Sequence, residues 1–157
     1  MTAIKLSDAL NGQVFCFDKP VDFTSFDVVN KFRWKLRQAG ASKSFKVGHA
    51  GTLDPFATGL LVVCTGKMTK SIDEIVGSQK TYESVFQFGQ STDSQDVTGN
   101  ITSARSVPIL TLDEIKSVID SYFVGELLQT PPMFSAKKID GKKLYELARK
   151  GKEIERE

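Results

Sequence analysis

The chain has 157 residues, 40% of them apolar and 25% charged, which is an ordinary globular composition and enough length for one domain with a buried core. Its 21 basic and 19 acidic residues give a formal charge of +2, too small an excess to indicate nucleic-acid binding by itself. The N-terminus lacks the apolar core of a signal peptide, and no apolar run approaches ~18 residues, so we expect no membrane span and a cytoplasmic protein.

The first predicted element is a short buried strand over residues 14–17 (VFCF). It should end at Asp18-Lys19-Pro20, because proline withdraws a backbone donor from a strand ladder.

A helix is predicted to follow, beginning at Thr24 or Ser25, with Asp27 near its positive end and Gly40 beyond its last turn. Apolar residues at helical spacing define its core face: Val28, Val29, Phe32 and Leu36. Basic residues occupy its other faces: Lys31, Arg33, Lys35 and Arg37. These cations are either a solvated surface or contacts for phosphate groups.

Three elements are predicted in the middle of the chain. The run LLVVCT between Gly59 and Gly66 is short enough for a buried strand, and residues 68–77 have helical spacing. In residues 81–89 (TYESVFQFG) polar and apolar side chains alternate, which predicts a third strand.

The last third of the chain predicts a polar loop over residues 91–100 and two helices. Thr111 and Glu114 form a capping box before the most amphipathic segment, which runs to Phe123. A second helix around residues 144–148 should stop at Gly151. Strands and helices do not alternate regularly, so we predict an α+β fold with a mixed, largely antiparallel sheet and flanking helices.

The two cysteines, Cys16 and Cys64, both lie in apolar runs, so we expect buried, reduced thiols. Two cysteines and one histidine cannot supply a convincing zinc site, and we predict no metal.

The segment GHAGTLDPFATG, residues 48–59, holds one carboxylate in a constrained loop. Glycines permit turns and close approach by another molecule, and Pro55 biases Asp54 away from helical geometry. Asp54 is therefore either a backbone cap in a tight turn or a fixed carboxylate for covalent chemistry at a sugar carbon. His49 would orient or deprotonate a substrate, or simply form hydrogen bonds in the loop.

Several common site motifs are absent from the sequence. The Gly66-Lys67 pair has leucine at the first glycine position of a P-loop and Met68 after the lysine. Neither G-x-G-x-x-G nor G-x-S-x-G occurs.

From residue 11 to residue 157 the sequence resembles the TruB-type bacterial tRNA pseudouridine synthases, which isomerise uridine 55 in the T-loop of tRNA. The resemblance rests on four segments in matching order: NGQVFCFDKP with TSFDVV, VGHAGTLDPFATGLLVVCTGKMTK, KTYESVFQFGQSTDSQDVTG and QTPPMFSAKKIDGKKLYELARKG.

The resemblance implies a role for each matched residue. Asp54 corresponds to the catalytic aspartate, His49 to the loop histidine near the flipped nucleotide, and Tyr82 to the tyrosine that stacks on the target base. Lys70 and Asp96 match polar residues that line the site. Lys19 and Pro20 match an early element that we expect to be structural. The implied partner is the T-arm stem-loop of tRNA, and no metal or organic cofactor is expected.

The resemblance also implies that residues 1–157 are the N-terminal part of a catalytic domain. We expect the rest of that domain, with an arginine that pairs with the catalytic aspartate, and a C-terminal RNA-binding domain to be absent. Activity of the chain alone, or its completion by a second chain or segment, is therefore an open question. The alternative function is a non-catalytic RNA-binding or tRNA-folding module.

Overall fold

The structure is a computed structural model that describes residues 5–135 and 137–155. The chain divides into two compact units, Met1–Tyr82 (unit 1) and Glu83–Glu157 (unit 2). The predicted boundary at Glu157 lies outside the described residues.

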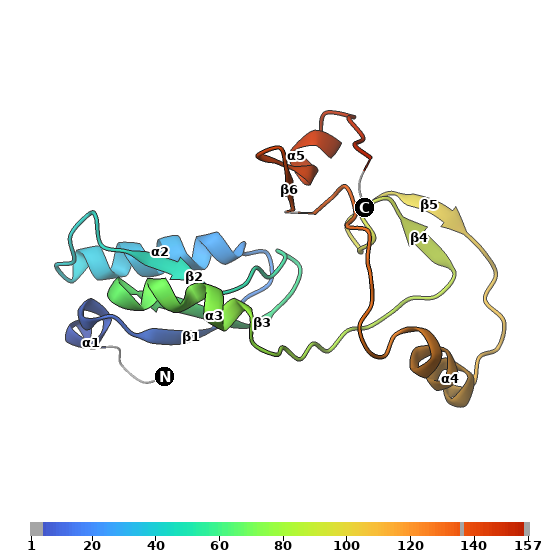
Figure 1. Ribbon diagram of the computed structural model, residues 1–157, viewed down its shortest axis with the longest axis horizontal. Helices are drawn as coiled ribbons and strands as arrows, with labels where there is room; N and C mark the ends of the chain where they lie inside the picture. The colour runs from blue at the N-terminus through green and yellow to red at the C-terminus, as the bar shows by residue number, and fades with distance from the viewer. Residues whose placement is uncertain (1–4, 136, 156–157) are drawn as a thin grey trace. The chain divides into compact units, whose positions relative to one another are not determined.

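Unit 1 is built on a three-stranded antiparallel sheet in the order β1-β3-β2 (Figure 1). The central strand, β3 (Gly59–Thr65), pairs with β1 (Val14–Lys19) on one side and β2 (Val47–His49) on the other. The predicted strands of residues 14–17 and 60–65 are thus confirmed, and β1 continues two residues further, to Lys19. β2 falls in a region where the sequence had predicted only a loop.

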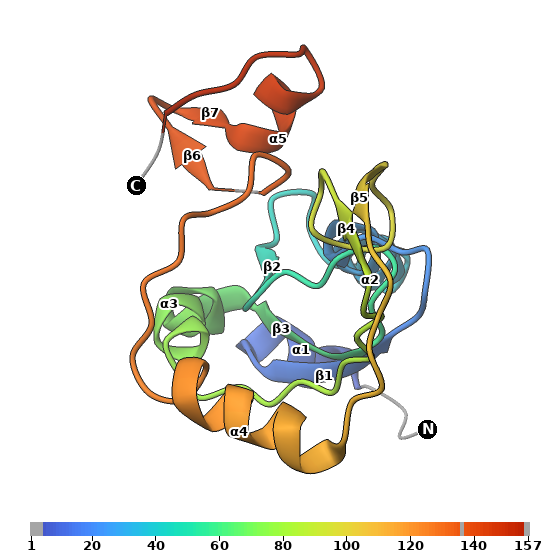
Figure 2. The ribbon, with the colours of Figure 1, turned by 90° about the vertical axis from the view of Figure 1, so that its right-hand side faces the viewer.

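Helix α2 (Ser25–Gln38) packs on one face of this sheet and forms the core of unit 1 with it (Figures 1 and 2). Thr24 is its N-cap, one of the two predicted start residues, and it forms a capping box with Asp27 that was not predicted. The predicted core face is buried, and Phe32 makes edge-to-face contacts with Phe15 and Phe17 at ring-centroid distances of 5.1 and 5.0 Å. Full burial of a side chain of this size contributes about 1.5–3 kcal/mol to stability.

Short helical segments flank the other parts of the sheet: α1 (Leu6–Asn11), the 3-10 helix η1 (Gly66–Ser71) and α3 (Ile72–Val76). The buried hydroxyl of Thr65, the last residue of β3, donates to the Ala9 carbonyl at 2.7 Å and accepts from the Gln13 N–H at 3.0 Å. The predicted helix over residues 68–77 is confirmed, with a 3-10 segment as its beginning.

The prediction that both thiols are buried is wrong for Cys16. Cys64 is buried, and desolvation raises its pKa, whereas Cys16 is exposed. The cause is the alternation of strand side chains: Phe15 and Phe17 pack against the core with α2, so Cys16 points to the opposite face, where it is exposed among the described residues.

Unit 2 contains a hairpin, a lone helix and a small ββα segment. The hairpin pairs β4 (Gln90–Thr92) with β5 (Ile101–Ala104), so the predicted polar loop is shorter than residues 91–100. The second hairpin pairs β6 (Lys138–Ile139) with β7 (Lys142–Lys143), directly before α5 (Leu144–Ala148). A small cluster of Met133, Leu144 and Leu147 forms its core, and Gly151, at φ +65°, follows the helix as predicted.

Helix α4 (Leu112–Tyr122) begins with the predicted capping box of Thr111 and Glu114, but none of its residues is buried. Hydrogen bonds from the backbone and side chain of Thr111 lower the pKa of Glu114. The apolar side of α4 is open to solvent, including Val118, Ile119 and Phe123.

The predicted strand over residues 81–89 does not form. Residues 79–87 have no regular secondary structure, and Val85 and Phe86 are 98% and 79% exposed. An alternating segment becomes a strand only when its backbone groups meet a partner, and no described strand pairs with this segment.

The α+β class is confirmed, and each strand pair among the described residues is antiparallel. No helix in the described part of the chain is both long and apolar enough to cross a membrane.

Candidate active site

The loop that carries Asp54 is fastened to the first turn of α2 by Ser25. The buried Ser25 hydroxyl accepts a hydrogen bond from the Leu53 N–H at 2.8 Å and donates one to the Leu53 carbonyl at 3.0 Å. Both backbone polar groups of the residue directly before Asp54 are therefore satisfied by one side chain.

The residue directly after Asp54 is held from a different segment. The Pro55 carbonyl accepts from the Asp22 N–H at 2.8 Å and from the Lys19 Nζ at 3.2 Å. Asp54 thus lies between two anchored neighbours, one tied to α2 and the other to the turn after β1.

Lys19, which donates to the Pro55 carbonyl, carries a charged group although its side chain is completely buried. Its Nζ also donates to the carbonyls of Pro20 at 2.9 Å and Phe23 at 2.6 Å. The three donors of an ammonium group therefore meet three backbone carbonyls, which compensates for removing the charge from water. The contacts are those of the structural role expected for Lys19.

Asp54 itself is exposed, and its backbone carbonyl accepts from the Ala57 N–H at 3.1 Å in the turn that follows. Within the described residues, its carboxylate receives no hydrogen bond. The loop therefore fixes the backbone of Asp54 and leaves the side chain facing solvent, which argues against the backbone-cap alternative. Gly51 and Gly59, at φ +109° and +115°, supply left-handed turns on either side of it.

His49 is the last residue of β2 and lies half-buried at the start of the same loop. Its Nδ1 is 2.7 Å from the Gly51 carbonyl. Because a carbonyl oxygen only accepts, Nδ1 carries the hydrogen in this contact, and Nε2 of the neutral ring is left as an acceptor.

Two other predicted residues lie in unit 1. Lys70 is exposed in η1, and Tyr82, the last residue of unit 1, is 68% exposed. Neither side chain is part of the core of unit 1.

Asp96, the fifth predicted residue, belongs to unit 2, where it closes the turn between β4 and β5. Its Oδ1 accepts from the Ser94 hydroxyl at 2.7 Å and from the Thr98 N–H and hydroxyl at 2.7 and 2.6 Å. Burial is the largest influence on its pKa and opposes ionisation, but the hydrogen bonds from Thr98 and Ser94 together lower that pKa. These contacts give Asp96 a structural role in its own turn.

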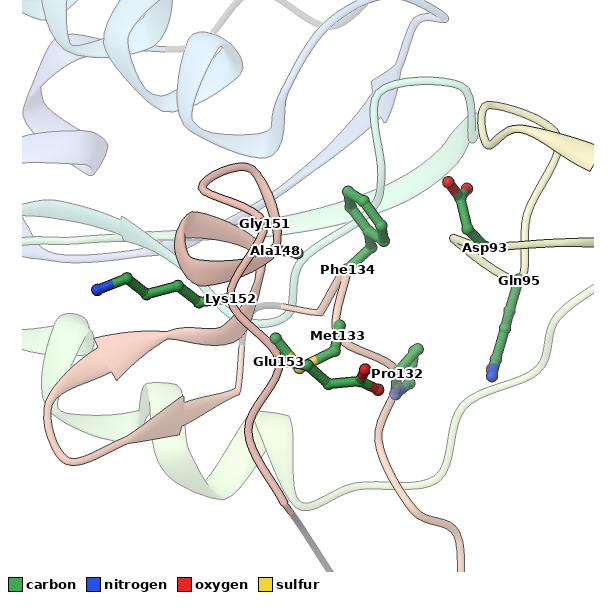
Figure 3. Close-up of a pocket in the computed structure, with 9 residues that line it drawn as sticks. All are labelled: Asp93, Gln95, Pro132, Met133, Phe134, Ala148, Gly151, Lys152 and Glu153. Atoms are coloured by element: carbon green, nitrogen blue, oxygen red, sulfur yellow. The ribbon is translucent and has the colours of Figure 1, made fainter. Parts of the chain in front are cut away.

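A cavity of about 300 Å³ in unit 2 contains none of the predicted site residues (Figure 3). Asp93 and Gln95, from the same turn as Asp96, line it together with residues 132–134 and the segment that ends and follows α5. Its few polar groups do not converge on one point in Figure 3, and we assign it no chemistry. No group of three metal-ligating side chains occurs in the part of the chain that the structure describes.

The sequence did not reveal Ser25 as part of this site. The residue was noticed only as a helix-start residue, and its partner Leu53 lies 28 positions away. Both the TSFD segment at the helix start and the LDP segment of the loop can be recognised in the sequence. Neither segment indicates that the two contact each other.

Comparison with known proteins identifies the family of this chain. A profile described as "TruB family pseudouridylate synthase (N terminal domain)" matches residues 35–157, which include the Asp54 loop. The chain is 47% identical over 148 residues to a tRNA pseudouridine synthase B of Parabacteroides distasonis, covering 94% of this chain and 63% of the relative. It is 46% identical over 147 residues to the protein of the same name from Flavobacterium johnsoniae, covering 93% and 64%.

The tRNA pseudouridine synthase B of Opitutus terrae is 45% identical over 144 residues, covering 92% of this chain and 57% of the relative. The chain belongs to the TruB family of pseudouridylate synthases. It spans about 60% of the length of these relatives.

Proposed function

We propose that this chain carries the catalytic aspartate of a tRNA pseudouridine synthase that acts on uridine 55 in the T-loop. The observation that supports this most is the geometry of Asp54: an exposed carboxylate whose two neighbours are fixed by Ser25, Lys19 and Asp22. A carboxylate that turns toward solvent from an anchored backbone is suited to react with a bound molecule.

The reaction is an isomerisation, so every atom of the uridine is retained. The bond from C1′ to N1 breaks, the uracil turns, and a new bond joins C1′ to C5. The hydrogen leaves C5, and N1 gains one. No water is consumed and no electron changes hands, so a single carboxylate suffices and neither a metal nor an organic cofactor is needed. Asp54 either attacks C1′ or removes a proton from the sugar.

The other residues serve the flipped nucleotide. Removing a uridine from its stack costs a few kcal/mol, and stacking on the Tyr82 ring would return roughly 1–3 kcal/mol. The exposure of Tyr82 supports this role, since its ring is free to meet a base. His49 would offer Nε2 as an acceptor at the start of the Asp54 loop. Lys70 and Asp96 would supply polar groups for substrate binding, as the family resemblance implies, and contacts with Ser94 and Thr98 fix the turn that carries Asp96.

In this proposal residues 1–157 form the N-terminal part of the catalytic domain, with the pseudouridine synthase fold, and the remaining third or more of the relatives' length completes it. The exposed apolar side chains in segment 82–88 and in α4 support this view, because apolar surfaces of this kind are normally buried against other parts of a protein.

The test is single-turnover pseudouridine formation in a T-arm hairpin RNA. The chain would be assayed alone and after addition of the remaining C-terminal segment of a relative. We expect product with the added segment and very little without it. Binding of the hairpin without product in both assays would instead favour the non-catalytic RNA-binding module.

A further inference from the structure

A second hollow lies in unit 1, beside the candidate site but separate from Asp54. This groove has a volume of about 460 Å³ and runs between α2 and residues 43–48, with Thr69 of η1 at its side. Four basic side chains line it: Arg33, Arg37, Lys43 and Lys46. No aspartate or glutamate is among the described residues that line it.

The two arginines are held in place by backbone carbonyls. Arg33 donates to the Val47 carbonyl at 2.8 Å and to Asn30 at 3.2 Å, and Arg37 donates to the Lys43 carbonyl at 2.9 Å. A guanidinium group has five N–H donors, so most donors of both arginines remain for an acceptor in the groove. Fixed guanidinium groups suit phosphate oxygens because little rotamer entropy is lost when they bind.

The arrangement follows from the helical repeat of α2. Phe26, Asn30, Arg33 and Arg37 are spaced three and four residues apart, so they form one stripe along the helix. Lys31 and Lys35 are two positions before the arginines, which turns them by about 200° to another face of the helix. They lie over the Phe23 and Trp34 rings instead. The basic residues of α2 thus form two separate groups.

The groove also adjoins the proposed active site along the chain. Its lining residue Gly48 precedes His49 in β2, and its lining residue Thr69 precedes Lys70. A strand of RNA with phosphates in the groove would therefore follow the same backbone segments that lead to the candidate site.

We propose that this groove binds backbone phosphates of the RNA substrate, and so contributes affinity and position without reading sequence. The inference rests on the proposed function only in taking RNA as the partner. Lys43 and Lys46 are exposed and lack side-chain partners among the described residues, so they would contribute charge with little effect on the fold.

The experiment measures RNA binding by the 157-residue chain at several salt concentrations, using fluorescence anisotropy. The probes are a T-arm hairpin and an unrelated hairpin of equal length. The test variant is Lys43→Gln with Lys46→Gln. The matched control is Lys31→Gln with Lys35→Gln, which removes the same charge from the other face of α2. Thermal unfolding verifies that both variants fold like the parent.

We expect the test variant to bind both hairpins several-fold more weakly, and its salt slope to be smaller by roughly 1.4–1.8, or 0.7–0.9 per lost phosphate contact. The control should keep the slope of the parent. Equal losses of RNA affinity in the two variants would indicate a diffuse electrostatic attraction and would overturn the inference. Equal salt slopes in all three proteins, or no RNA binding by the parent, would also overturn it. Pseudouridine formation is assayed separately, with the C-terminal segment of a relative added. A groove effect on RNA binding with no product even after that addition would contradict the proposed function and leave the groove inference standing.

Discussion

The Ser25 hydroxyl and the Leu53 backbone form a reciprocal pair of hydrogen bonds, at 2.8 and 3.0 Å, that joins the start of α2 to the loop of Asp54. One hydroxyl acts as both acceptor and donor, so no other side chain is needed to satisfy this buried backbone. The position of the candidate catalytic carboxylate is therefore tied to a helix that begins almost thirty residues earlier.

Ser25→Ala should loosen this connection. The substitution leaves the Leu53 N–H and carbonyl without partners and should lower the free energy of unfolding by about 1–3 kcal/mol. Hydrogen exchange of the Leu53 amide, measured by NMR, should be faster than in the parent. Ser42→Ala is a suitable control, because Ser42 is exposed and, among the residues that the structure describes, its hydroxyl forms a hydrogen bond only with that of Ser44. Unchanged exchange at Leu53 would contradict the role of Ser25.

Asp54→Asn should abolish turnover in any form of the enzyme that is active, because the amide keeps the size of the side chain and removes its charge. RNA affinity should stay within several-fold of the parent, since it comes mainly from phosphate contacts. Stability should not change, as the carboxylate is exposed. Single-turnover assays and anisotropy measure the two effects, and near-normal turnover would refute the assignment.

Tyr82→Leu should slow the chemical step while leaving the unfolding transition unchanged, because the ring is largely exposed in unit 1. Loss of roughly 1–3 kcal/mol of stacking predicts a single-turnover rate about 5- to 150-fold lower. Tyr82→Phe keeps the ring and shows whether the hydroxyl also moves a proton. A normal rate for Tyr82→Leu would mean that the ring does not stack on the target base.

Acid should weaken the N-terminal capping box of α2 only at low pH. Hydrogen bonds from the side chain and backbone of Thr24 lower the pKa of Asp27 below its ordinary value of 3.8. A lowered pKa in the folded state means that the stabilising effect is present above 3.8 and is lost as pH falls through the folded value. NMR titration of the Asp27 carboxylate and the Thr24 amide measures this, and Asp27→Asn should remove the transition from the Thr24 amide. A midpoint at or above 3.8 would contradict it.

The 157-residue chain alone should self-associate, because the apolar side of α4 is open to solvent. We also expect very weak activity, because the rest of the proposed catalytic domain is not part of this chain. Ile119→Lys with Phe123→Lys should reduce association in concentration-dependent light scattering, without loss of stability. Ser117→Lys with Ser121→Lys adds the same charge to exposed polar positions of α4 and should have less effect. A monomeric chain with one cooperative unfolding transition and full turnover would contradict this prediction, since the apolar side of α4 would then not need to be buried by another segment.

Local chemistry explains which parts of the fold the sequence predicted. The N-cap at Thr24 and the capping box of Thr111 and Glu114 depend on residues at most three positions apart, and both form as predicted. The core face of α2 and the apolar strand β3 were also predictable, because helical spacing and a short apolar run leave few alternatives.

The failures all concern contacts between distant segments. The alternation of residues 81–89 predicts a strand, but a strand also needs a neighbour, and none of the described strands provides one. Cys16 lies in an apolar run, yet its burial depends on which face of β1 is covered. For the site, the motif indicated Asp54 and His49 but not the anchors at Leu53 and Pro55, which come from residues far away in the sequence.

Because the Asp54 loop is anchored on both sides, the entropy cost of ordering its backbone is separate from the free energy of substrate binding. Fixing the backbone of one residue costs about 1–2 kcal/mol of conformational entropy. Because Lys19, Asp22 and Ser25 fix both neighbours of Asp54 when unit 1 folds, that cost belongs to folding and does not recur in each catalytic cycle. Substitutions that weaken unit 1 far from the loop should then lower the fraction of molecules with an ordered carboxylate, so that the catalytic rate and the local stability of the loop fall together.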